Sequence, residues 1–211
     1  MKMREIRVLG ADYMPRIREA AEGRESRTIE GYAVVFGRES VLLCDYWDEY
    51  REIIEPGAID QALLDSSDIK MTLWHNRERL LARRNNGAGT LEVGIDPTGV
   101  WYRFEAPATP DGDTALELVR RGDLAGSSFM YTTDEANDVR YEKLEDGTVV
   151  RHVIKVSRIY DMTIASDPAY TDTTVNAREV ERRFAGRESD AEVAACVRRL
   201  REDANSVFRK I

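Results

Sequence analysis

Short runs of β-branched and aromatic residues, separated by glycine, proline and aspartate, recur from about residue 28 to residue 170 and restrict the fold most strongly. The clearest runs are TIEGYAVVFG, DIKMTLWH, TLEVGI, VWYRFEA and AGSSFMYTT. Two short helices are predicted between them, in IDQALLD and in TPDGDTALELVRRGDL, where an aspartate begins the second helix and Gly122 ends it. This spacing predicts a mainly β protein with peripheral helices, an α+β fold built on a single β-barrel domain, rather than a layered α/β sheet.

The composition divides the chain into three parts. Residues 1–27 form a polar N-terminal segment with a short strand predicted in REIRVL, and residues 28–176 form the strand-rich domain. Residues 177–211 are rich in Arg, Glu and Ala, with apolar residues at helical intervals, and we expect a charged helical C-terminal tail. The tail is either a solvated terminal helix or a segment that docks on a partner or is removed.

The bulk composition also limits partners and cofactors. A net charge of −8 would repel a phosphate backbone, which argues against nucleic acid as a main partner. Cys44 and Cys196 lie far apart and no Cys/His cluster occurs, so we expect no metal, cofactor or disulfide. No stretch has the length and hydropathy of a signal peptide or a membrane span, so we expect a cytoplasmic protein without a membrane partner.

The two histidines are the imidazoles available for acid–base chemistry. His75 ends the apolar strand in MTLWH, just before a charged turn predicted at residues 76–79, where its ring could be half-buried and still face a cleft. His152 alternates with apolar residues in VVRHVIKV, as a residue on a strand face does. A single histidine at a strand end more commonly has a structural role than a catalytic one, so His75 needs partners to be more than that.

Two other segments could supply such partners. Ser127 and Ser128 lie on one predicted strand and point to opposite faces, and a serine needs an adjacent base to become a nucleophile. Asp161 interrupts an apolar strand in IYDMTIA, where a carboxylate requires a partner. It either pairs with Lys or Arg on an exposed strand face or orients a histidine during acyl transfer.

In this order, the segments resemble the prohead (capsid maturation) proteases of tailed bacteriophages of the HK97 type, which are related in fold to the herpesvirus assemblin serine proteases. The resemblance covers about residues 28 to 176. The segments that carry it are IEGYAVVFG, EIIEPGAIDQAL, MTLWHN, GTLEVGIDPTGVWYRFEAP, LVRRGDLAGSSFMY and IYDMTIASDPAYTDTTV. The resemblance implies a β-barrel of the assemblin type.

The resemblance also implies site residues. Ser128 is the implied nucleophile, because the family serine lies six residues after the glycine that ends the preceding helix, here Gly122. His75 is the implied general base, and Asp161 is the implied third member of the triad. The chain departs from the family pattern at Asp161, where glutamate is more typical, and at Met130, where a small residue is usual.

The implied function is a serine endopeptidase that cleaves the phage major capsid protein, its scaffolding segment and its own chain during prohead maturation. It would act by acyl-enzyme chemistry in the host cytoplasm, inside the assembling procapsid. The departures at Met130 and Asp161 motivate one alternative, a catalytically weak or inactive assembly module on the same fold. A second alternative is a Ser–His–His arrangement with His152 in place of Asp161. Substrate-binding residues, cleavage specificity and oligomeric state, a homo-oligomer included, stay open.

Overall fold

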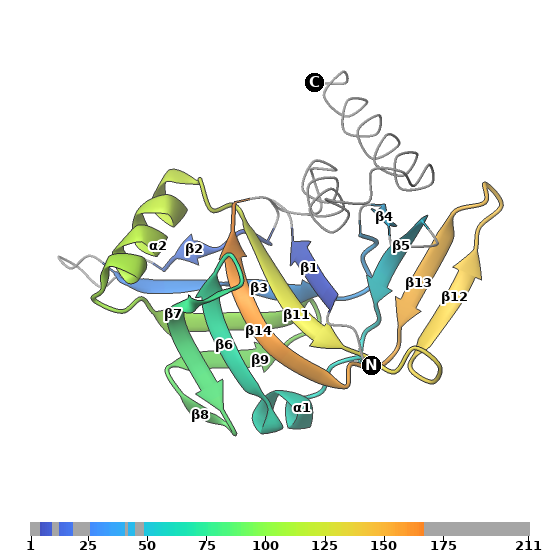
Figure 1. Ribbon diagram of the computed structural model, residues 1–211, viewed down its shortest axis with the longest axis horizontal. Helices are drawn as coiled ribbons and strands as arrows, with labels where there is room; N and C mark the ends of the chain where they lie inside the picture. Colours follow the sequence, from blue (N-terminus) through green and yellow to red (C-terminus); the bar gives the residue numbers. More distant parts are fainter. Residues whose placement is uncertain (1–4, 10–12, 19–25, 41, 45–48, 167–211) are drawn as a thin grey trace, which may run out of the picture.

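The computed structural model describes residues 5–9, 13–18, 26–40, 42–44 and 49–166, whose strands form three sheets (Figure 1). The six-stranded sheet contains, in spatial order, β1 (Glu5–Leu9), β11 (Gly126–Thr132), β14 (Arg158–Ala165), β6 (Asp68–Leu73), β7 (Asn76–Asn85) and β8 (Ala88–Gly89). The second sheet contains β2 (Arg16–Ile17), β3 (Thr28–Val35), β10 (Gly99–Glu105) and β9 (Leu91–Ile95). The third contains β12 (Val139–Lys143), β13 (Val149–Val153), β5 (Glu49–Ile54) and β4 (Leu43–Cys44).

The mainly β prediction is confirmed, but the described strands do not form the single closed barrel that we expected. Each of the three sheets is open at both edges. The edge strands β2, β4 and β8 are two residues long, so they offer too few backbone groups to continue the ladder into a closed barrel.

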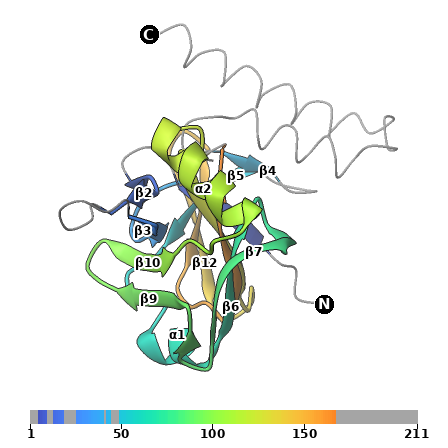
Figure 2. The same ribbon diagram turned by 90° about the vertical axis from the view of Figure 1, so that its left-hand side faces the viewer.

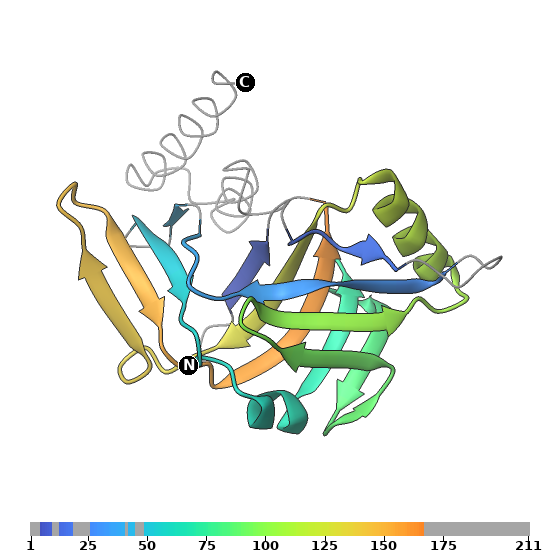
Figure 3. The same cartoon turned by 180° about the vertical axis from the view of Figure 1, so that it is seen from behind.

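The core lies where the second sheet packs against one face of the six-stranded sheet. Figure 2 and Figure 3 show β3, β10 and β9 crossing the six-stranded sheet on one side. Phe129 and Tyr131 of β11 stack with ring centroids 5.0 Å apart and belong to the same buried cluster as Tyr102 and Phe104 of β10. Burial of an aromatic or aliphatic side chain of this size stabilises the fold by about 1.5–3 kcal/mol each.

The two helices lie at the edges of this core. Helix α1 (Gln61–Ser66) is capped by Asp60, whose side chain accepts a hydrogen bond from the Leu63 N–H. Helix α2 (Pro110–Arg121) lies beside β2 and β7 (Figure 2). We expected an aspartate to begin this helix, but its N-cap is Thr109, with Pro110 at the first helical position. Asp111 and Asp113 instead lie within the first turn, where their negative charge interacts favourably with the positive end of the helix dipole.

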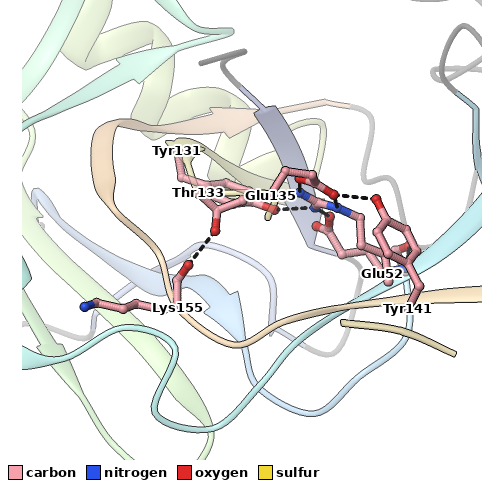
Figure 4. A network of polar contacts seen from close by, with 8 residues as sticks. Glu52, Tyr131, Thr133, Glu135, Tyr141 and Lys155 are labelled. Atoms are coloured by element: carbon pink, nitrogen blue, oxygen red, sulfur yellow. Dashed lines mark hydrogen bonds and ion pairs between the residues drawn. The ribbon is translucent and has the colours of Figure 1, made fainter. Parts of the chain in front are cut away.

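The third sheet extends to one side of the fold and is joined to the six-stranded sheet through ion pairs and hydrogen bonds centred on the buried Arg151 (Figure 1, Figure 4). The Arg151 side chain on β13 is almost completely buried, and its guanidinium bonds the carboxylates of Glu52 on β5 and Glu135. The same guanidinium donates to the Tyr131 hydroxyl on β11 at 3.3 Å. Tyr141 donates to Glu135, and partial desolvation of its half-exposed ring together with that hydrogen bond raises the Tyr141 pKa. These contacts connect β5, β12 and β13 to the strand that carries Ser128.

The N-terminal segment contributes strands to the sheets. The strand predicted in REIRVL is confirmed as β1, which pairs with β11 in an antiparallel register that places Val8 opposite Ser128. The predicted helical tail, residues 177–211, and its boundary at residue 176 lie outside the described residues. Neither of the two described helices has the length and hydropathy needed to cross a bilayer.

Candidate active site

Three adjacent strands of the six-stranded sheet bring the predicted site residues together. Ser128 lies on β11, Asp161 lies on the neighbouring β14, and His75 follows β6, the next strand. Ser128 lies opposite Thr163, which is two residues beyond Asp161 on the same strand face. Since β14 and β6 run parallel, the end of β6 delivers His75 to the same region.

A tight turn positions the histidine. Leu73 pairs with Asn76, so Trp74 and His75 alone connect β6 to β7. Both have positive φ, 54° and 55°, as a type I′ hairpin turn requires, although Asn-Gly is the usual sequence there. We had expected the turn at residues 76–79, but these residues begin β7. A left-handed conformation costs a residue with a Cβ about 1–2 kcal/mol, so neighbouring contacts must hold this turn.

One such contact comes from β7 and α2. The Arg79 guanidinium lies 4.6 Å from the centroid of the Trp74 ring. Its Nε donates to the Asp111 carboxylate at 2.7 Å, which ties the stacked arginine to the first turn of α2. The exposed Trp74 ring is thereby held against a charged partner, an arrangement that stabilises the turn preceding the imidazole.

The imidazole of His75 bridges the other two residues. Its Nε2 lies 2.8 Å from Ser128 Oγ, and its Nδ1 lies 2.5 Å from Asp161 Oδ1. With the proton on Nδ1, the ring donates to the carboxylate and accepts from the serine hydroxyl. This tautomer leaves Nε2 able to take the hydroxyl proton, which is the role of a general base.

These three side chains are largely buried from solvent. Ser128 and Asp161 are buried, while the His75 side chain keeps 16% of its surface exposed. Asp161 Oδ2 is buried and has no hydrogen-bond partner in the described part of the chain. A buried carboxylate needs a hydrogen-bond donor to offset its lost hydration, and the described donor to Asp161 is the Nδ1–H of His75.

The remaining candidates face elsewhere. Ser127 points into the core, where its Oγ lies 2.8 Å from the Tyr102 hydroxyl. His152 lies on β13 in the third sheet, with Nδ1 2.6 Å from Glu55 Oε1 and Nε2 3.2 Å from Glu142 Oε2. The structure thus joins Asp161, not His152, to the His75 ring.

Met130 and Thr163 also lie close to this arrangement. Met130 is half-buried and lies opposite Asp161 in the β11–β14 register. Sequence reasoning missed Thr163, whose hydroxyl accepts from the His75 backbone N–H at 3.0 Å. Its position two residues after Asp161, on the same face of a predicted strand, was a signal that could have identified it.

The described residues contain no group of three or more His, Cys, Asp and Glu side chains arranged to hold a metal ion. The hydroxyl–imidazole–carboxylate series at His75 is the arrangement by which serine hydrolases are recognised.

Comparison with known proteins places the chain in a family. A family model described as caudovirus prohead serine protease matches residues 13–185, and the chain belongs to that family. The bacteriophage T4 capsid assembly protease, gp21, has a similar structure at 9% sequence identity and a TM-score of 0.45, over 79% of this chain and 99% of that chain. No curated protein matches the sequence.

Proposed function

We propose that the protein is a serine endopeptidase in which Ser128 is the nucleophile, His75 the general base and Asp161 the group that orients the imidazole. The observation that carries the proposal is the pair of short contacts on one ring, 2.8 Å from Nε2 to Ser128 Oγ and 2.5 Å from Nδ1 to Asp161 Oδ1. Membership of a serine protease family supports the same assignment.

In the first half of the reaction, Ser128 Oγ attacks the peptide carbonyl carbon while His75 Nε2 takes the hydroxyl proton. The imidazolium then gives that proton to the leaving amine, and the C–N bond breaks to leave an acyl-enzyme. In the second half, His75 Nε2 takes a proton from water as the water oxygen attacks the ester carbonyl carbon. The imidazolium then returns that proton to Ser128 Oγ, and the ester C–O bond breaks to release the carboxylic acid product and free Ser128. Asp161 stabilises the imidazolium in both halves through Nδ1.

The burial of Ser128 and the stabilisation of the oxyanion both affect the rate of this reaction. Ser128 is buried, so a peptide reaches its hydroxyl only after the groups over it move aside. Backbone N–H donors at the oxyanion would each contribute about 3 kcal/mol to the transition state.

The substrates follow from the family rather than from the site. We propose that the protein cleaves the phage major capsid protein with its scaffolding segment, and its own chain, inside the assembling procapsid in the host cytoplasm. The family description, a prohead serine protease, supports this location and substrate class. Removal of the charged segment 177–211 would be one self-cleavage event.

The test uses the full chain and the capsid precursor of the same phage. Ser128→Ala should abolish cleavage of the precursor and of the chain itself, because the attacking oxygen is gone. Ser127→Ala is the matched control: it removes the neighbouring hydroxyl, which contacts Tyr102 in the core, and should leave cleavage intact in the folded protein. Processing by the Ser128 variant at the normal rate would show that another group is the nucleophile.

A catalytically inactive assembly module is the second candidate, and the burial of Ser128 favours it. The two candidates separate under assembly conditions, with capsid precursor and enzyme co-expressed. The protease cleaves the precursor there and the Ser128→Ala variant does not. An assembly module leaves the precursor uncut in both cases while particles still form.

A further inference from the structure

Thr163 lies between the strands that carry the nucleophile and the base. In the sheet register it faces Ser128 of β11 on one side and Thr72 of β6 on the other. The residue is completely buried. Because Asp161 lies two residues earlier on the same strand, the Thr163 side chain lies on the strand face that holds the candidate triad.

The hydroxyl of Thr163 makes two hydrogen bonds that fix the β6–β7 turn. It accepts from the His75 backbone N–H at 3.0 Å and donates to the Thr72 carbonyl at 2.8 Å. The next carbonyl on β14, that of Ile164, accepts from the Trp74 N–H at 3.3 Å. Both residues of the turn are thus bound through their backbone to β14.

We propose that Thr163 is a positioning residue for the protease reaction, which clamps the left-handed turn so that the His75 imidazole meets Ser128 and Asp161; this inference rests on the proposed function. The turn has positive φ at both residues, a conformation that persists only when surrounding contacts impose it. Asp161 lies on the same strand, two residues before Thr163. One strand therefore sets the place of the acid directly and the place of the base through a hydroxyl.

Thr163→Val tests the clamp because valine keeps the shape and removes the hydroxyl. The His75 N–H and the Thr72 carbonyl then lose their common partner. Thr72→Val is the matched control, since the Thr72 hydroxyl is also buried on β6 but has no hydrogen-bond partner in the described part of the chain. Thr163→Ser restores the hydroxyl and should restore function.

The first measurement is cleavage of the capsid precursor by the full chain. For Thr163→Val we expect kcat to fall roughly 10–100-fold with little change in KM, because a displaced imidazole affects the chemical step rather than substrate binding. The Thr72→Val and Thr163→Ser proteins should stay close to wild type. Should the valine variant fail to fold, Thr163→Ala against Thr163→Ser gives the same comparison.

The second measurement does not depend on turnover. In a Ser128→Ala background, proton NMR should show a low-field signal from the His75 Nδ1–H bound to Asp161, and Thr163→Val should shift or remove it in protein that is still fully folded at the temperature of the measurement. The His152 ring, bound to Glu55, gives the other such signal, which His152→Gln identifies. Thr72→Val should leave the His75 signal in place.

Two results would overturn the clamp: wild-type kcat with an unchanged low-field signal in Thr163→Val, or an equal loss in Thr72→Val. The outcome for the proposed function is read separately. Cleavage by Ser128→Ala contradicts the assignment of Ser128 as the nucleophile and the clamp with it, whereas an inactive Ser128→Ala beside a fully active Thr163→Val contradicts the clamp alone.

Discussion

The Asp161 carboxylate has one described hydrogen-bond partner, the His75 ring. Its Oδ1 bonds the His75 ring, and its Oδ2 is buried without a described partner. In the proposed mechanism, a carboxylate in this position selects the tautomer that leaves Nε2 free to accept the Ser128 proton. The typical family glutamate is one methylene longer, yet the shorter aspartate reaches the ring at 2.5 Å because β14 lies next to β6.

Asp161→Asn should therefore lower kcat by about 10³–10⁴-fold while the protein stays folded, since the amide favours the wrong tautomer of His75. Cleavage of the capsid precursor by the full chain measures the effect. His152→Ala is the comparison, and we expect a much smaller loss from it because His152 pairs with Glu142 of β12 and with Glu55, which directly follows β5. A larger loss from His152→Ala would favour the Ser–His–His alternative.

Asp68, the first residue of β6, gives a pH-dependent prediction. Hydrogen bonds from Arg83 and Lys70, at 2.7 Å and 2.6 Å, hold the pKa of the Asp68 carboxyl well below its ordinary range. A lowered folded-state pKa adds stability that is present above the unfolded-state pKa, about 3.9, and is lost as the pH falls toward the folded-state value.

Asp68→Asn should accordingly reduce the free energy of unfolding at pH 7 by about 0.5–1 kcal/mol, the range of partly exposed ion pairs. The difference from wild type should shrink as the pH falls below about 4, where the unfolded chain takes up the proton first. Urea unfolding at a series of pH values measures this difference. A gap that stays constant with pH would show that the ionised carboxylate is not the source.

At the scale of elements, the strands and helices were more predictable than the turn that carries His75. The alternation in TLEVGI and VWYRFEA, with DPTG between, predicted the hairpin observed as β9 and β10. The turn at Trp74 and His75 was missed because neither residue is a usual turn former, and its positive φ depends on contacts from β14 and Arg79. Such contacts come from tertiary structure, which local sequence does not show.

The C-terminal end of helix α2, at Gly122, allows a prediction about stability. Gly122 has φ 77° and donates its backbone N–H to the last turn, and a Cβ placed there would meet no atom within 4 Å. Gly122→Ala should thus reduce the free energy of unfolding by about 1 kcal/mol through backbone conformation alone. Gly122→Asn should cost less, because asparagine tolerates the left-handed region. Thermal or urea unfolding distinguishes them, and equal effects would contradict a conformational origin.

At the scale of the whole molecule, sequence patterns predicted the strand content but not how the sheets close. Whether a sheet becomes a barrel depends on the length and pairing of its edge strands, and three edges here are two-residue strands. The meeting of Ser128, His75 and Asp161 likewise depends on the order β11-β14-β6, which no single segment reveals. The family resemblance predicted that these three residues meet. The sequence patterns alone indicated only that each residue type could take part in such a site.

Substitutions in the Arg151 network test how much its ion pairs stabilise the third sheet. Arg151→Met leaves the buried Glu52 without its main cation, so we expect a loss of about 3–5 kcal/mol in the free energy of unfolding. Adding Glu52→Gln should recover part of this loss, because the uncompensated charge is removed. Urea unfolding of the single and double variants measures both effects. A single variant within about 0.5 kcal/mol of wild type would show that the pair is dispensable.

The most direct measurement is labelling of the full chain with a fluorophosphonate probe, followed by mass spectrometry of its peptides. The probe forms a bond to a serine oxygen only where a neighbouring base activates it. We predict one adduct, on Ser128, that disappears in His75→Gln and persists in His152→Gln. An adduct on another serine, or labelling of Ser128 that is unchanged without the His75 imidazole, would contradict the account.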